Sequence, residues 1–154
     1  MKKTRINFFV IILVSAILLM LLNHYMSYSM RIGDTQFYLV ETAATSKDGR
    51  PLLGLYCKDM YGGYKGVNMS GFPRFVFWND TYLISKNCDG NNTKITRYIV
   101  INRDSVNESD GDIAVLHIFK TEMEYRNYLN KIDLSEAEMK QIDNHITWWK
   151  LLFK

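Results

Sequence analysis

The amino-acid sequence predicts an α+β fold: an N-terminal membrane segment, then a small antiparallel sheet of about five strands with two C-terminal helices packed on it. Three observations lead to this prediction. Residues 8–22 form an uncharged apolar run, strand-like segments alternate with turn residues up to position 102, and two helix-capping spacings follow. We expect a cytoplasmic tip, membrane segment and tether over residues 1–32 and one domain over residues 33–154, because about 120 residues suffice for a single core.

The apolar run extends from Phe8 to Leu22 and follows three basic residues. As a helix it would be about 22 Å long, shorter than the roughly 30 Å hydrocarbon core of a bilayer, so it spans a membrane only together with its flanks. Two interpretations stay open: a signal-anchor that keeps the N-terminus cytoplasmic, or a signal peptide cleaved near residues 27–29. The first predicts a single-pass cell-membrane protein with an extracytoplasmic C-terminal domain, and the second a secreted or periplasmic protein.

The formal net charge of +3 does not indicate a nucleic-acid partner. Residues 1–32 contain four basic residues and no acidic residue, which leaves fifteen basic and sixteen acidic residues, a net charge of −1, for the rest of the chain. The basic residues there are scattered singly among Asp and Glu. Because phosphate binding requires clustered basic residues, we expect no nucleic-acid binding.

Strand-like segments fill the first part of the predicted domain. Five of them combine β-branched or aromatic residues with flanking turn residues, and they occupy residues 36–41, 52–58, 74–78, 81–86 and 94–102. The turn in residues 45–51 joins the first two as a hairpin. The next three form an antiparallel meander with which this hairpin can pair.

A glycine-rich stretch, residues 59–73, separates the hairpin from the meander and is predicted to be a loop. Its four glycines match neither the spacing of a phosphate-binding loop nor the dinucleotide-binding pattern. Two interpretations stay open: a long surface connection, or a partner-binding loop in which Tyr61, Tyr64 and Lys65 supply adaptable contacts.

The sequence contains two cysteines, Cys57 and Cys88, and both lie in the predicted domain. In an oxidising compartment they are a candidate disulfide, whose loop of about thirty residues would stabilise the fold by roughly 3 kcal/mol. The alternative is a pair of buried free thiols, since cysteine is a common core residue. The sequence has no C-x-x-C motif and no Cys/His cluster, so we expect neither a zinc site nor thioredoxin-like chemistry.

Two helices are predicted after the apolar run at residues 113–119, which suits a last strand or the entry to a helix. Thr121 and Glu124 have the capping-box spacing and predict a helix over about residues 122–131. Ser135 and Glu138 repeat this spacing and predict a second helix, whose apolar face comprises Met139, Ile142, Ile146, Trp149 and Phe153.

The C-terminal residues 146–154 widen the apolar face of the second predicted helix. They either dock on the sheet or lie against a membrane surface, where tryptophan and lysine are favoured. Trp148, Trp149 and Phe153 are the candidate membrane-surface contacts.

Catalytic motifs are absent from the sequence. The three histidines are far apart, neither G-x-S-x-G nor H-E-x-x-H occurs, and the acidic loop at residues 104–112 lacks the ligand order of an EF-hand. We therefore predict no catalytic residue, no cofactor and no metal site, although carboxylates that are distant in sequence can still converge in a fold.

Residues 72–129 contain the segments FVFWNDTYLISK, TRYIVIN and IFKTEMEYRNYL. In this combination the chain resembles a loose group of small exported bacterial proteins of unknown function. Many of those proteins carry a lipid-attachment cysteine after the apolar segment, and this chain does not. The resemblance implies a small α+β domain outside the cytoplasm and supplies no catalytic residue.

These observations predict a membrane-anchored extracytoplasmic protein that binds another protein or an envelope component, with an immunity- or inhibitor-like role. Two alternatives stay open. One is an envelope enzyme without a recognisable motif, and the other is a structural or assembly subunit of a membrane complex that uses the anchor itself.

Overall fold

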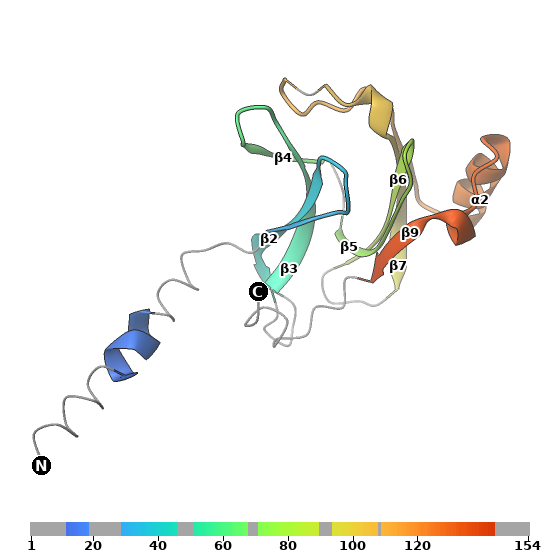
Figure 1. Cartoon of the computed structure of the whole chain (residues 1–154). Coiled ribbons are helices and arrows are strands. Elements are labelled where there is room, and N and C mark those ends of the chain that lie inside the picture. The colour runs from blue at the N-terminus through green and yellow to red at the C-terminus, as the bar shows by residue number, and fades with distance from the viewer. Residues whose placement is uncertain are drawn as a thin grey trace, which may run out of the picture.

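The computed structural model describes residues 12–18, 29–45, 51–67, 71–89, 94–107 and 109–143, which contain two antiparallel sheets (Figure 1). The four-stranded sheet has the order β1-β2-β3-β4, with β1 (Ser29–Arg31), β2 (Phe37–Thr45), β3 (Pro51–Lys58) and β4 (Tyr64–Gly66). The five-stranded sheet has the order β8-β7-β6-β5-β9, with β5 (Phe72–Trp78), β6 (Tyr82–Cys88), β7 (Ile95–Asn102), β8 (Leu116–Phe119) and β9 (Lys140–Asp143). The remaining named elements are the helix α2 (Glu122–Lys131) and the 3-10 turns η1 (Arg103–Ser105) and η2 (Glu136–Glu138).

The strands and α2 form three layers, in the order four-stranded sheet, five-stranded sheet, α2 (Figure 1). The core between the two sheets contains Ile32, Phe37, Leu39, Leu53, Leu55, Cys57, Val67, Val76, Trp78, Leu83, Ile99 and Ile101. A second core lies between the five-stranded sheet and α2 and contains Phe77, Ile84, Tyr98, Val100, Tyr125, Leu129 and Met139. The five-stranded sheet is therefore buried on both faces.

Residue patterns in the strands match these layers. Neighbours in the five-stranded sheet enter different cores: Ile99 enters the core between the sheets, and Val100 enters the core beneath α2. Such a strand needs apolar residues at consecutive positions, as β7 has. In β2 and β3, buried residues alternate with more exposed ones. The four-stranded sheet thus has one core face and one outer face.

The predicted fold class, with one small sheet and two C-terminal helices, is wrong. The five predicted strands are present as β2, β3, β5, β6 and β7, but they are divided between two sheets. Four further strands complete these sheets: β1 lies in the predicted tether, β4 in the predicted glycine-rich loop, β8 in the apolar run and β9 in the second predicted helix. Local sequence does not encode which strands pair, because strand stability depends on the neighbours across the sheet.

The predicted second C-terminal helix is replaced, in the part that the structure describes, by η2 and β9. Ser135 makes no side-chain capping bond, and β9 pairs antiparallel with the otherwise open edge of β5. Met139 and Ile142 pack in different cores, so these two residues lie on opposite sides of the five-stranded sheet and not on one face of a helix. The first predicted helix is confirmed as α2, with a complete capping box between Thr121 and Glu124.

The predicted membrane segment is also corrected. Of this segment the structure describes only residues 12–18, which are helical. Among the described residues, no helix has both the length and the apolar character needed to cross a membrane. This finding overturns the predicted transmembrane signal-anchor and the membrane localisation derived from it.

Candidate functional site

The outer face of the four-stranded sheet carries a row of tyrosines and a lysine. In the register of the strands, Tyr38 lies opposite Tyr56, and Lys58 lies opposite Tyr64. Their immediate neighbours in β2 and β3 point into the core, so these four side chains share the opposite face. Gly54 contributes to the same face, since a methyl group at this position would lie 2.8 Å from the Tyr56 ring. The result is a broad aromatic surface.

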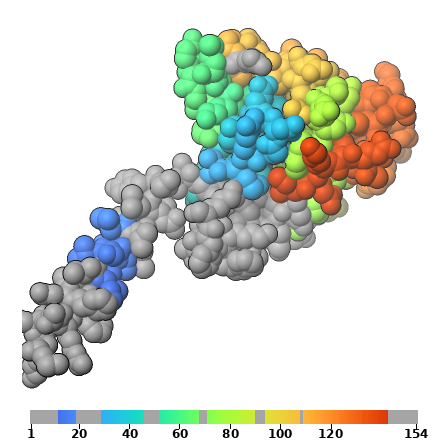
Figure 2. Space-filling model, in the orientation of Figure 1, coloured from blue at the N-terminus to red at the C-terminus, as the bar shows by residue number. Residues whose placement is uncertain are grey.

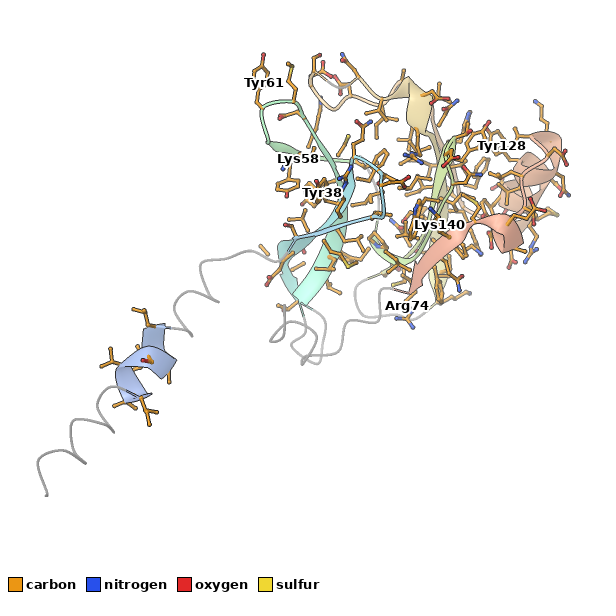
Figure 3. All side chains as sticks on the ribbon, viewed as in Figure 1. Tyr38, Lys58, Tyr61, Arg74, Tyr128 and Lys140 are labelled. Carbon is orange, nitrogen blue, oxygen red and sulfur yellow. The ribbon has the colours of Figure 1, made fainter. Side chains whose placement is uncertain are left out.

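Lys58 lies between two of these aromatic rings. Its Nζ is 5.5 Å from the ring centroid of Tyr38 and 5.8 Å from that of Tyr64. The two rings meet edge to face at 5.3 Å, and the Tyr64 hydroxyl donates to Ser29 Oγ at 3.4 Å. The electron-rich faces of both rings attract the ammonium ion, so these contacts are cation–π interactions. Figure 3 shows Tyr38 and Lys58 side by side on this face.

The charge of Lys58 has no acidic partner within the described residues: no ion pair joins its Nζ to a carboxylate there. The adjacent Asp59 is engaged in the turn, where its Oδ1 accepts from the amides of Tyr61 at 2.9 Å and Gly63 at 2.7 Å. The positive charge of Lys58 thus lies at an aromatic surface, where a carboxylate of another molecule can approach it.

The turn between β3 and β4 projects beyond this surface. Tyr61 is 86% exposed and Met60 is 66% exposed at its tip, and Gly62 adopts a positive φ of 87° that shapes the turn. In the space-filling view (Figure 2), the β3–β4 hairpin (green) stands out at one end of the molecule. We call Tyr38, Lys58, Tyr61 and Tyr64 the tyrosine–lysine surface.

The structure separates the three residues of the predicted partner-binding loop. Tyr64 joins the cluster with Tyr38 and Lys58, and Tyr61 occupies the tip of the turn. Lys65 pairs with Asp112, whose acceptance of a hydrogen bond raises the lysine pKa. Lys65 therefore connects β4 to the loop after β7 and is not part of the tyrosine–lysine surface.

Sequence reasoning missed Tyr38 and Lys58 as members of the site. Both lie within strands that it did predict, and the alternation of buried residues in these strands contains the signal. If Phe37 and Cys57 face the core, Tyr38 and Lys58 must face outwards. What the sequence does not contain is the pairing of β3 with β2 on one side and β4 on the other, which brings Tyr38, Lys58 and Tyr64 together.

The two cysteines lie in different sheets. Cys57 is fully buried in β3 and Cys88 is partly buried at the end of β6, and both are free thiols in the structure. Burial, aided by the charge of Asp59, raises the pKa of Cys57 to about 11. Burial also raises the pKa of Cys88. Both groups are consequently poor nucleophiles at neutral pH.

A second cluster of titratable groups lies beneath α2. Lys86 Nζ is 2.7 Å from Glu136 Oε2, the Tyr125 hydroxyl donates to Glu136 Oε1, and the Lys86 ammonium lies 5.6 Å from the Tyr125 ring centroid. Burial and the hydrogen bond to Glu136 raise the pKa of Tyr125 far above its usual range. Since these groups already satisfy one another, the cluster ties η2 to β6 and α2, and we assign it a structural role.

Other predicted features have no counterpart in the described residues. Trp148, Trp149 and Phe153, the candidate membrane-surface contacts, lie outside these residues. Within the part of the chain that the structure describes, no group of three or more His, Cys, Asp or Glu side chains is arranged to hold a metal ion.

Comparisons of the chain with known protein families, with curated proteins and with solved structures find no match.

Proposed function

We propose that this protein binds another protein through the tyrosine–lysine surface, and that the bound segment carries an acidic side chain. The observation that supports this function is the position of Lys58, a cation between the rings of Tyr38 and Tyr64 with no ion-pair partner within the described residues. The proposal retains the binding role predicted from the sequence and does not depend on the predicted membrane anchor.

Tyrosine is well suited to such a contact. Its ring supplies a large, rigid area at low entropic cost, and its hydroxyl can hydrogen-bond at the rim. Tyrosine is one of the residue types enriched at the few positions that contribute most of the binding energy of protein interfaces. Tyr61, exposed at the tip of the turn, can reach a partner seated on the sheet face. The surface therefore combines apolar contact area with one charge that selects the partner.

The lysine supplies the selectivity. A hydrogen bond to a charged group contributes about 1.5–3 kcal/mol when it is shielded from water, which corresponds to a factor of roughly 10 to 150 in the dissociation constant. The two rings exclude water from part of the ammonium ion and so favour the upper part of this range. A partner with a carboxylate at this point should be preferred over one with an amide.

Selection from a displayed library of random dodecapeptides, with the full-length protein as bait, tests this function. We expect the enriched peptides to contain Asp or Glu together with apolar residues. Replacement of Lys58→Met should weaken their binding by at least about tenfold, because the methionine keeps the length and removes the charge. Lys131→Met, at the C-terminal end of α2 in another layer, is the matched control and should leave binding unchanged.

Two results would contradict the proposal. One is a set of enriched peptides without acidic residues, and the other is acidic peptides that bind the Lys58→Met and Lys131→Met variants equally well. Tyr64→Ala separates the aromatic contribution, and it should weaken binding even of peptides in which the acid has been replaced by its amide.

A further inference from the structure

The strand β8 is an open edge of the five-stranded sheet. The Asn102 amide donates to the Val115 carbonyl at 3.3 Å, and in an antiparallel pair such bonding recurs at every second residue. Leu116 and Ile118 lie between the bonded positions, so their amides and carbonyls point away from β7. Within the described residues, these four backbone groups have no hydrogen-bond partner.

The side chains beside this edge are apolar and partly uncovered. Leu116 and Ile118 lie opposite Ile101 and Ile99, which places both on the face towards the core between the sheets. Ile118 is nevertheless 45% exposed, and Val115, just before the strand, is 39% exposed. The core between the sheets thus ends at β8 with apolar surface that no described residue covers completely.

The absence of charge distinguishes β8 from the other sheet edges. Folded proteins protect open edges with charged residues, which hinder pairing with another strand. Among the edge strands that the structure describes, β1 contains Arg31, β4 contains Lys65, and β9 contains Lys140 and Asp143. The residues of β8, Leu-His-Ile-Phe, include no Lys, Arg, Asp or Glu.

We propose that β8 pairs antiparallel with β8 of a second copy of this chain, so that the two five-stranded sheets join into one continuous sheet. With the two-fold axis at His117, Leu116 of each copy lies opposite Ile118 of the other. The outward-pointing amide and carbonyl of Leu116 then form hydrogen bonds with those of Ile118 in the other copy, on both sides of the axis. The Leu–Ile pairs extend the core between the sheets from one copy to the next.

Charged residues oppose the pairing of two copies at β4 but not at β8. The same operation at β4 would place Lys65 directly opposite Lys65 of the other copy, and like charges in this position destabilise strand pairing. At β8 the residue that lies opposite itself is His117, and no pair of Lys, Arg, Asp or Glu residues arises within the strand. The contact is also isologous, so it closes as a dimer and leaves no further β8 edge for a third copy.

Sedimentation equilibrium of the full chain at concentrations from about 1 to about 500 µM tests this inference. We expect a monomer–dimer equilibrium whose dissociation constant rises at least about tenfold in Ile118→Lys, because this variant puts a charge opposite Leu116 of the second copy. Met123→Lys is the matched control: it exchanges another exposed apolar residue, on α2, for the same charge and should leave the equilibrium unchanged.

Amide hydrogen exchange of the wild-type chain provides a second readout that does not depend on any variant. The amides of Leu116 and Ile118 should exchange more slowly as the protein concentration increases. Two results would overturn the inference. One is a chain that stays monomeric at all concentrations, which would leave the edge open to a strand of another protein. The other is a dimer whose dissociation constant is unchanged in Ile118→Lys and in which the exchange rates of the Leu116 and Ile118 amides do not depend on concentration. The outcome is independent of the proposed function, since Lys58→Met lies in the other sheet and should not alter the dimer.

Discussion

Gly33 and Trp78 illustrate how single residues constrain this fold. Gly33 has a φ of 54°, in the region that favours glycine, and a methyl group built on it would lie 2.5 Å from Trp78 Nε1. The glycine thus serves both the turn before β2 and the packing of the indole against the backbone. Gly62 has a similar positive φ of 87°, but a methyl group there would meet only the Lys58 side chain at 3.8 Å.

Alanine at these two glycines should separate backbone strain from packing. We expect Gly62→Ala to cost about 1–2 kcal/mol of unfolding free energy, the usual penalty of a left-handed alanine. Gly33→Ala should cost about 1–3 kcal/mol more, because the indole must also move. Urea denaturation measures both values. Equal losses in the two variants would show that Trp78 adapts without cost.

Cys57 should make the stability depend on alkaline pH. Its pKa is raised from 9.0 to about 11 by burial, so the folded state holds the thiol proton more tightly than the unfolded state does. The stabilisation from this group is complete below pH 9 and is lost as the pH rises from 9 to 11, by up to about 3 kcal/mol. We expect the difference in unfolding free energy between the wild type and Cys57→Ala to shrink over this range.

The control for this measurement is Cys88→Ala, whose thiol is less buried and should show a weaker dependence. A wild-type curve parallel to that of Cys57→Ala would contradict the prediction. Thiol counting in denaturant, without a reductant, also tests the disulfide expected from the sequence: free thiols, as in the structure, give two reactive groups per chain.

The cluster beneath α2 shows how side-chain contacts hold η2 against β6 and α2. Glu136 accepts from both Lys86 and Tyr125, and the Lys86 and Glu136 side chains are only 17% and 25% exposed. The pair between Arg126 and Glu122 on the same helix is exposed on both sides, at 69% and 54%. Exposed pairs contribute little, whereas the loss of one partner from a less exposed pair leaves a charge without compensation.

The same substitution at the two glutamates should therefore have different effects. Glu136→Gln should lower the unfolding free energy by about 1–3 kcal/mol, because the lysine loses its counter-charge in a half-buried position. Glu122→Gln should change it by no more than about 0.5 kcal/mol. Denaturant titration of both variants at neutral pH decides this. A loss at Glu122→Gln as large as that at Glu136→Gln would show that the cluster adds nothing beyond a surface pair.

The sequence predicts the helix α2 correctly and the strand β9 incorrectly, and a comparison of the two shows why. The capping box of Thr121 and Glu124 is a local signal, because both partners lie in one turn, and the helix follows it. Ser135 and Glu138 have the same spacing, but β9 instead supplies a partner for β5 from more than sixty positions away in the chain. A short segment with apolar residues three apart fits either structure, and tertiary pairing decides between them.

At the scale of the whole molecule, the sequence contains a pattern that indicates the central layer of the structure, and a single-sheet prediction does not use it. Consecutive apolar residues in β7, such as Ile99 and Val100, are required when both faces of a sheet are covered. The alternation in β2 and β3 indicates a sheet with one covered face. This contrast distinguishes two kinds of strand, but the order of the strands and the position of Lys58 between Tyr38 and Tyr64 depend on pairings between distant segments.

The three-layer arrangement also predicts how the folded protein opens. Ile84 and Ile99 lie in central strands with neighbours on both sides and cores on both faces, so their amides should exchange with solvent only through global unfolding. β4 is a three-residue edge strand with exposed side chains, and we expect the Lys65 amide to be less protected by at least about 2 kcal/mol. Native-state hydrogen exchange followed by NMR measures these free energies. Equal protection of Lys65 and Ile99 would mean that the hairpin opens only with the whole fold. The predicted difference would instead let the part of the hairpin that carries Tyr61 and Tyr64 adjust to a partner while the central sheet stays intact.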